Sequence, residues 1–157
     1  MRVYLPATLT ELSATHGLSA RTGRAVTEHL RAALGEQDDE ETAEFGALVL
    51  AAADSLDLLA AADAPRRVVV AAEVPPATVH PTDADADEEP GQVQVPALGW
   101  DRVVSFHVDE PTSAVTQLVQ NARTGQDGAR QRVEELDLLW YDATERAELI
   151  AQDTPGS

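Results

Sequence analysis

"RRVVVAAEVPP", residues 66–76, is the stretch of the 157-residue sequence that decides its fold class. A short run of valines and alanines that ends at paired prolines predicts a strand in the middle of a sheet or covered on both faces. Helical periodicity precedes it over residues 38–62, and strand-like composition follows it at 103–108. The sequence therefore predicts an α+β fold around this strand.

The order of the expected elements indicates a particular topology. Strand, helix, strand, strand, helix and strand follow one another, which is the ferredoxin-like βαββαβ order. In that arrangement the helices cover one face of the sheet, and the first and third strands are adjacent and parallel. A helical insertion near the N-terminus and a C-terminal helix through Ile150 extend this frame. The expected elements are strand 3–5, helix 38–62, strand 66–74, strand 103–108, helix 111–122 and strand 138–141.

The insertion over residues 18–35 has two interpretations. Its apolar residues fit one helix, but residues 24–26 are also compatible with an extended segment. In the second case Thr27 caps a shorter helix, and we favour this interpretation.

The chain length favours one compact domain, because a chain of this size forms one adequate hydrophobic core. We expect a single α+β domain over residues 1–152 and a frayed tail at 153–157. Residues 76–92 combine prolines with an acidic tract, and this composition predicts a mobile acidic loop.

Three aspartates in that acidic tract, Asp83, Asp85 and Asp87, have the spacing that opens a calcium-binding loop. The sixth position of the motif is Glu88 where glycine is needed, and the twelfth is Gln94 where a bidentate glutamate is needed. We therefore interpret the tract as a solvated loop, and the sequence predicts no metal and no cofactor.

The charge of the chain excludes several function classes. The formal net charge is −17, from 28 acidic and 11 basic residues, and every basic residue is arginine. A field of this sign repels phosphate backbones and anionic lipid, so we expect no nucleic-acid or membrane partner. The sequence contains no cysteine, no run of membrane-helix length and no signal-peptide pattern, and we expect a cytoplasmic protein.

The helix expected over 38–62 has a clear apolar stripe, which predicts its packing face. Leu50 and Leu58 fall off that stripe, beside Asp54, and are candidates for contact with another partner. The stripe consists of Phe45, Leu48, Val49, Ala52, Leu56 and Leu59.

The strand at 103–108 supplies the candidate catalytic residues. Because side chains alternate along a strand, Phe106 should face the helix-covered core, and Ser105 and His107 the open face. The first strand would add Tyr4 there, and the last strand either Tyr141 or Trp140. A neutral histidine beside tyrosine can act as an acid, a base or a ligand anchor.

The alternative interpretation of His107 is structural. A second subunit, or the segment 18–35, would cover the open face, and His107 would be hydrogen-bonded there. A single histidine without a paired carboxylate, nucleophile or metal ligand is not a catalytic set. The neighbouring Asp109 and Glu110 precede Pro111 and are expected to cap the next helix.

Four stretches resemble a family of small uncharacterised actinobacterial proteins. They are the opening MRVYLPAT, the strand RRVVVAAEVP, the strand end HVDE and the closing LLWY. The resemblance covers most of the chain but is weak at 17–36 and in the acidic loop. It implies an actinobacterial origin and carries over no catalytic residues.

These observations favour a non-enzymatic cytoplasmic protein-interaction or self-association domain. A homodimer, or a complex with an unidentified protein, is the expected form. The alternative is a small enzyme or ligand-binding protein that uses a pocket around Tyr4, Ser105 and His107 on the open sheet face.

Overall fold

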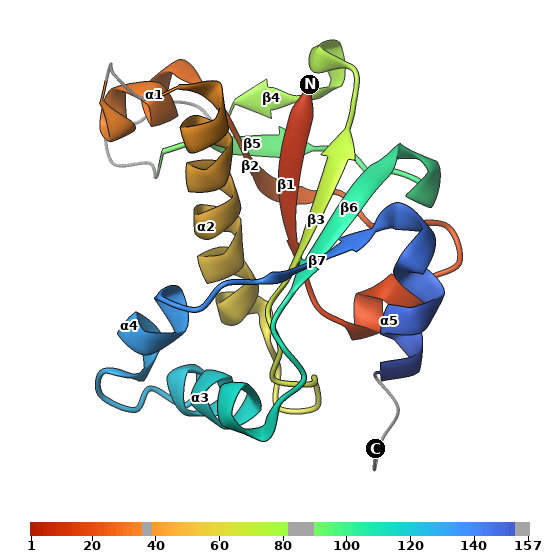
Figure 1. Ribbon diagram of the computed structural model, residues 1–157. Helices are drawn as coiled ribbons and strands as arrows, with labels where there is room; N and C mark the ends of the chain where they lie inside the picture. The colour runs from red at the N-terminus through yellow and green to blue at the C-terminus, as the bar shows by residue number, and fades with distance from the viewer. Residues whose placement is uncertain (36–38, 82–89, 153–157) are drawn as a thin grey trace.

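A computed structural model describes residues 1–35, 39–81 and 90–152 of the chain. In these ranges seven strands form one antiparallel sheet with the order β4-β5-β2-β1-β3-β6-β7 (Figure 1). The strands are β1 Arg2–Ala7, β2 Arg21–Ala25, β3 Val68–Glu73, β4 His80–Pro81, β5 Gln92–Val95, β6 Val103–Val108 and β7 Leu139–Asp142.

The helices lie on both sides of this sheet, with α2 on one side and α5 on the other (Figure 1). In the ranges described, none of them combines the length and apolarity that crossing a membrane requires. The α-helices are α1 Glu28–Leu34, α2 Glu40–Leu58, α3 Ser113–Arg123, α4 Ala129–Glu134 and α5 Arg146–Gln152. The 3-10 turns are η1 Thr10–Ser13, η2 Pro76–Thr78, η3 Trp100–Arg102 and η4 Ala143–Glu145.

The valine-rich strand β3 lies inside the sheet, between β1 and β6, as predicted. It pairs with β1 along one edge and with β6 along the other, and only Glu73 of its residues is exposed. The valine run is therefore explained by burial on both faces. The predicted α+β fold class is also confirmed.

The ferredoxin-like arrangement is wrong. β1 runs antiparallel to β3, with Tyr4 opposite Ala71, where the prediction placed a parallel pair between β1 and β6. The other edge of β1 is occupied by β2, with Tyr4 opposite Arg24. Because β2 and β3 take both edges of β1, β6 can pair only with the far side of β3.

The interpretation of residues 18–35 as a short strand and a short helix is confirmed. β2 includes residues 24 and 25 of the extended segment, and the Thr27 side chain accepts a hydrogen bond from the Leu30 N–H at the start of α1. That bond satisfies one of the helix's free amide groups.

The segment 76–92, predicted as one mobile loop, contains regular elements at its margins, and the mobility stays a prediction. Residues 76–78 form η2, and His80 pairs with Gln94 of β5. Val79 is 7% exposed in the core, and its burial anchors this segment to the sheet. The acidic residues 83–89, with the candidate calcium ligands Asp83, Asp85 and Asp87, lie outside the described residues.

The two faces of the sheet pack against different elements. On one face Phe106 and its neighbours pack with Leu12 of η1 and Leu149 of α5. On the other face Tyr4 and Ala71 pack with alanines of α2. The prediction that both helices cover the Phe106 face is therefore wrong: α2 lies on the side to which Ser105 and His107 point.

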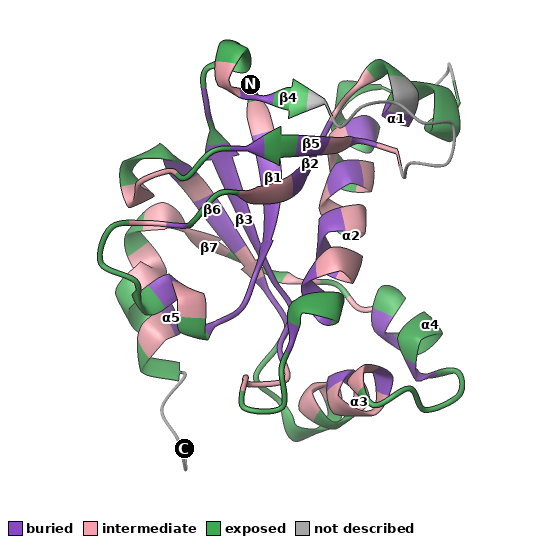
Figure 2. Ribbon diagram, turned by 180° about the vertical axis from the view of Figure 1, so that it is seen from behind, coloured by how far each residue is buried: buried purple, intermediate pink, exposed green. Residues whose placement is uncertain are grey.

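The predicted packing face of α2 is also wrong in part. The helix meets the sheet through small side chains, which allow a close approach of helix and strands. Phe45 is 59% exposed and Val49 is 39% exposed. Figure 2 shows buried and partly exposed surfaces alternating along α2. The buried residues of α2 are Ala43, Ala47, Ala51, Ala52, Ser55 and Leu56.

Candidate functional site

A groove of about 500 Å³ lies between α2 and the segment that leads from α4 to β7. The segment passes beside α2 in Figure 1. We call this feature the α2 groove. Its lining consists of Phe45, Leu48, Val49, Ala52, Arg67, Glu134, Glu135, Leu136, Asp137 and Leu138.

The α2 groove exists because the apolar stripe of α2 is covered over only half its length. Leu56 and Leu59, at the C-terminal end, pack against Val119 of α3 and Val133 of α4. Phe45 and Val49 continue the same stripe toward the N-terminus, are exposed, and are not part of the cluster with α3 and α4. In the N-terminal half of the stripe, Leu48 packs partly buried against the cluster around Tyr4, and Phe45 and Val49 remain exposed in the described structure.

The apolar surface continues onto β7. Leu138 contacts the cluster under α2, and Trp140, two residues further, is 61% exposed. Trp140 pairs with His107 of β6, so its side chain belongs to the same sheet face as His107. Leu139, on the other face, is 36% exposed.

The rim of the α2 groove is acidic. Glu134, Glu135 and Asp137 are exposed along the segment opposite α2. Glu134 has a weak contact with a basic partner, because Arg130 lies 3.8 Å away and bonds mainly to Asp57. These carboxylates therefore remain available to a ligand.

Arg67 is the basic residue of the groove lining, and its charge is already compensated. Its guanidinium donates to both carboxylate oxygens of Asp109, at 3.0 and 2.8 Å. Its main-chain N–H donates to the same carboxylate at 2.8 Å. Asp109 is fully buried, so the expected cap of the next helix is wrong: Thr112 caps α3.

The candidate residues Tyr4, Ser105 and His107 lie on one sheet face, with Ala71 of β3 between Tyr4 and Ser105. Ser105 Oγ and His107 Nε2 are 3.0 Å apart. Tyr4 and Ser105 are buried, at 6% and 4% exposure, and His107 is partly exposed. Of the two aromatic residues proposed to join them, Trp140 is on this face and Tyr141 packs into the opposite core.

The electrostatic setting of these residues favours their neutral forms. Burial, and secondarily the positive charge of Arg2, lowers the pKa of His107 below its ordinary value of 6.5. Burial, and secondarily the charge of Glu44 on α2, raises the pKa of Tyr4. A neutral imidazole next to a serine hydroxyl can exchange a hydrogen bond with a polar ligand.

The two candidate interaction residues, Leu50 and Leu58, do not lie together. Leu50 is half-buried against the cluster around Tyr4 and Leu30. Leu58 is 48% exposed at the rim of a second pocket. Within the described ranges no three acidic or histidine side chains gather in a way that could hold a metal ion.

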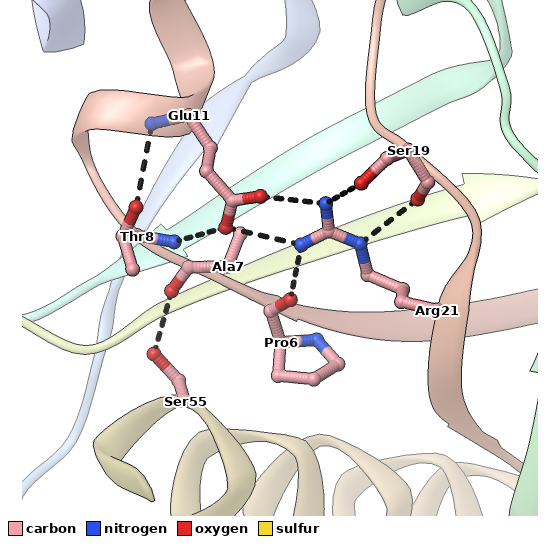
Figure 3. Close-up of polar contacts among 7 residues, drawn as sticks. All are labelled: Pro6, Ala7, Thr8, Glu11, Ser19, Arg21 and Ser55. Carbon is pink, nitrogen blue, oxygen red and sulfur yellow. Dashed lines mark hydrogen bonds and ion pairs between the residues drawn. The ribbon is translucent and has the colours of Figure 1, made fainter. Parts of the chain in front are cut away.

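The second pocket, of about 590 Å³, is built around the ion pair of Arg21 and Glu11 (Figure 3). Arg21 donates to both oxygens of Glu11, at 3.1 and 2.6 Å, and also to Ser19. Asp54, also in the lining, accepts two hydrogen bonds from the buried Arg24. The charges in this pocket are satisfied internally, which gives the network a structural role.

These observations define the class of protein: it has an antiparallel α+β fold with an exposed apolar groove. The chain belongs to a family of unknown function: the model of the Family of unknown function (DUF6912) matches residues 1–150. Neither the curated proteins nor the solved structures gave a match. The resemblance to an uncharacterised family is thus confirmed, and the actinobacterial origin stays a prediction.

Proposed function

We propose that the protein is a non-enzymatic protein-interaction domain that binds its partner through the α2 groove. One observation carries the proposal. The apolar stripe of α2 is packed against α3 and α4 over its C-terminal half and is exposed over its N-terminal half, at Phe45 and Val49. A partner that covers the exposed half would complete a helix face that the fold leaves half finished.

The composition of the surface supports this interpretation. The formal net charge of the chain is −17, yet the large apolar side chains of Phe45 and Val49 are exposed in one groove. Exposed apolar surface in a groove marks interaction sites in soluble proteins. Complete burial of one such side chain would contribute about 1.5–3 kcal/mol to a complex.

The expected partner is another protein in preference to a second copy of this chain. A homodimer formed through the α2 groove would bring two rims together, each with Glu134, Glu135 and Asp137. Like charges in contact oppose association. Cytoplasmic location remains part of the proposal as a prediction from sequence.

Photo-crosslinking tests the proposal. A photoreactive amino acid replaces Phe45 in one variant and Glu148, exposed on α5, in a matched control variant, each expressed in cells that naturally make the protein. We expect one discrete adduct at position 45 that Trp140→Ser abolishes, and none at position 148. Equal adducts at both positions, or none at 45, would contradict the proposal, and an adduct of two chains would show a homodimer.

A second candidate function follows from the hydrogen bond between Ser105 and His107. We propose as the alternative that Tyr4, Ser105 and His107 anchor a small polar ligand or substrate. The test is a thermal-shift screen of metabolites against the wild type and His107→Ala. A metabolite that raises the melting temperature of the wild type and not of the variant supports the alternative, and a screen without such a metabolite removes it.

A further inference from the structure

Resting on the proposed interaction function, we infer that the α2 groove binds an amphipathic helix of another protein whose apolar face is flanked by arginine or lysine. The chemistry of this partner follows from the charge of the rim, the elements that form the groove and the length of the open stripe.

The charge of the partner follows from the two walls of the groove. On one wall Glu134, Glu135 and Asp137 are exposed, and Arg67, whose guanidinium also donates to the Leu136 carbonyl at 3.4 Å, is neutralised by buried Asp109. The other wall is apolar, at Phe45 and its neighbours on the stripe. Complementarity therefore requires basic groups beside the partner's apolar side chains.

The helical form of the partner follows from the elements that line the groove. Its lining comes from α2, from Arg67 and from residues 134–138, and contains no residue of β7. At the end of β7, Glu145 Oε1 already accepts the main-chain N–H of Asp142 at 3.1 Å. A partner in this groove contacts side chains of α2 and of residues 134–138 and no strand edge, which is how a helix binds in a groove.

The size of the groove limits the length of the contact. The lining of α2 extends from Phe45 to Ala52, which is about 10 Å along the helix axis at 1.5 Å per residue. Roughly two turns of a docked helix fit this length, with apolar anchors at positions i, i+3 or i+4, and i+7. Trp140, exposed on the neighbouring strand, extends the apolar surface at one side.

The test measures binding of labelled synthetic peptides to the full chain by fluorescence anisotropy. The probe peptide has leucines at i, i+3, i+4 and i+7 and arginines on the remaining positions. One control peptide has the same composition with the leucines scrambled, and a second has glutamate in place of arginine. We expect the probe to bind at least about tenfold more tightly than either control, the equivalent of burying one large apolar side chain.

Two charge variants separate the α2 groove from the general charge of the chain. The first combines Glu134→Gln, Glu135→Gln and Asp137→Asn at the rim. The second, a matched control, combines Glu28→Gln, Glu110→Gln and Glu148→Gln, which are exposed and outside the groove lining. We expect the first to weaken binding and to reduce its dependence on salt, and the second to do neither.

Phe45→Ser tests the apolar wall, and Leu58→Ser, an exposed leucine of α2 outside the groove, is its control. We expect about a tenfold loss of affinity for Phe45→Ser and none for Leu58→Ser. Equal binding of the scrambled peptide, preference for the glutamate peptide, or equal losses in both charge variants would overturn the inference. If the crosslink at position 45 still forms, the interaction function stands and only the partner's chemistry is wrong; if it also fails, both fall.

Discussion

Asp109 shows how one buried carboxylate joins two strands. It is fully buried, and its carboxylate accepts hydrogen bonds from the main chain and guanidinium of Arg67, whose positive charge compensates its own. We predict that Asp109→Ala lowers the free energy of unfolding by about 3–5 kcal/mol, because Arg67 is left charged and buried. The control Asp57→Ala removes an exposed pair with Arg130 and should cost less than about 1 kcal/mol.

Urea unfolding measures both changes. Similar losses in the two variants would contradict the assignment of Asp109 as the buried partner of Arg67. The sequence pattern placed Asp109 at the cap of the next helix because a carboxylate before a proline is typical there. Its contact with Arg67, which is 42 residues away, depends on the pairing of β3 and β6, and local spacing does not contain that information.

His107 gives the protein a pH-dependent stability. Its pKa is lowered in the folded state by burial, so the unfolded chain binds a proton first as the pH falls below 6.5. The stabilisation is therefore complete above pH 6.5 and is lost as the pH falls through the folded pKa. We predict that His107→Gln removes this component.

Melting temperatures of wild type and His107→Gln, measured from pH 8 to 5, test this prediction. The wild type should lose more stability than the variant below pH 6.5. Parallel curves would contradict a lowered pKa of His107 in the folded state.

At the scale of the element, α2 has a sheet face of alanines and an open face of larger side chains. We predict that Ala51→Leu, at a fully buried position, destabilises the fold by about 1–3 kcal/mol through overpacking. Phe45→Ser should change stability by less than about 1 kcal/mol, because most of Phe45 is exposed. Denaturant midpoints of the two variants check the order, and a larger loss for Phe45→Ser would mean that Phe45 belongs to the core.

The element scale also shows what the sequence could predict. β3 and β7 carried strong local signals and are found in the structure, and so is the short helix capped by Thr27, which was the favoured of two interpretations. β5, QVQV, lacked a usable signal because it is short and half polar. The stripe of α2 was visible, but the part that α3 and α4 cover depends on tertiary packing, so Phe45 was assigned to the core.

The candidate site, too, could be predicted from the sequence only in part. Alternation correctly separates Phe106 from Ser105 and His107, because it is a local property of a strand. Which of the two faces α2 covers depends on the order of strands in the sheet. That order was set by the partners of β1, which the ferredoxin-like prediction misassigned.

At the scale of the whole molecule, charge repulsion opposes folding. With a formal net charge of −17, screening of the carboxylates should stabilise the compact state. We predict a melting temperature that rises between 0.01 and 1 M NaCl, as the Debye length falls from about 30 Å to about 3 Å. A melting temperature that falls steadily with salt would show that ion pairs such as Arg21–Glu11 outweigh the repulsion. In the same measurement, one cooperative unfolding transition would support the single domain predicted over 1–152.

The most direct test of the central claim is a map of where the arginine–leucine peptide binds the full, isotopically labelled chain. Amide chemical shifts in a two-dimensional ¹H–¹⁵N spectrum are compared with and without the peptide. The account predicts shifts concentrated at residues 44–52 of α2 and at 134–140, with β5 and the pocket around Arg21 unchanged. Shifts concentrated in that pocket, shifts spread over acidic residues throughout the chain, or no shifts at saturating peptide would contradict the claim that the α2 groove is the binding surface.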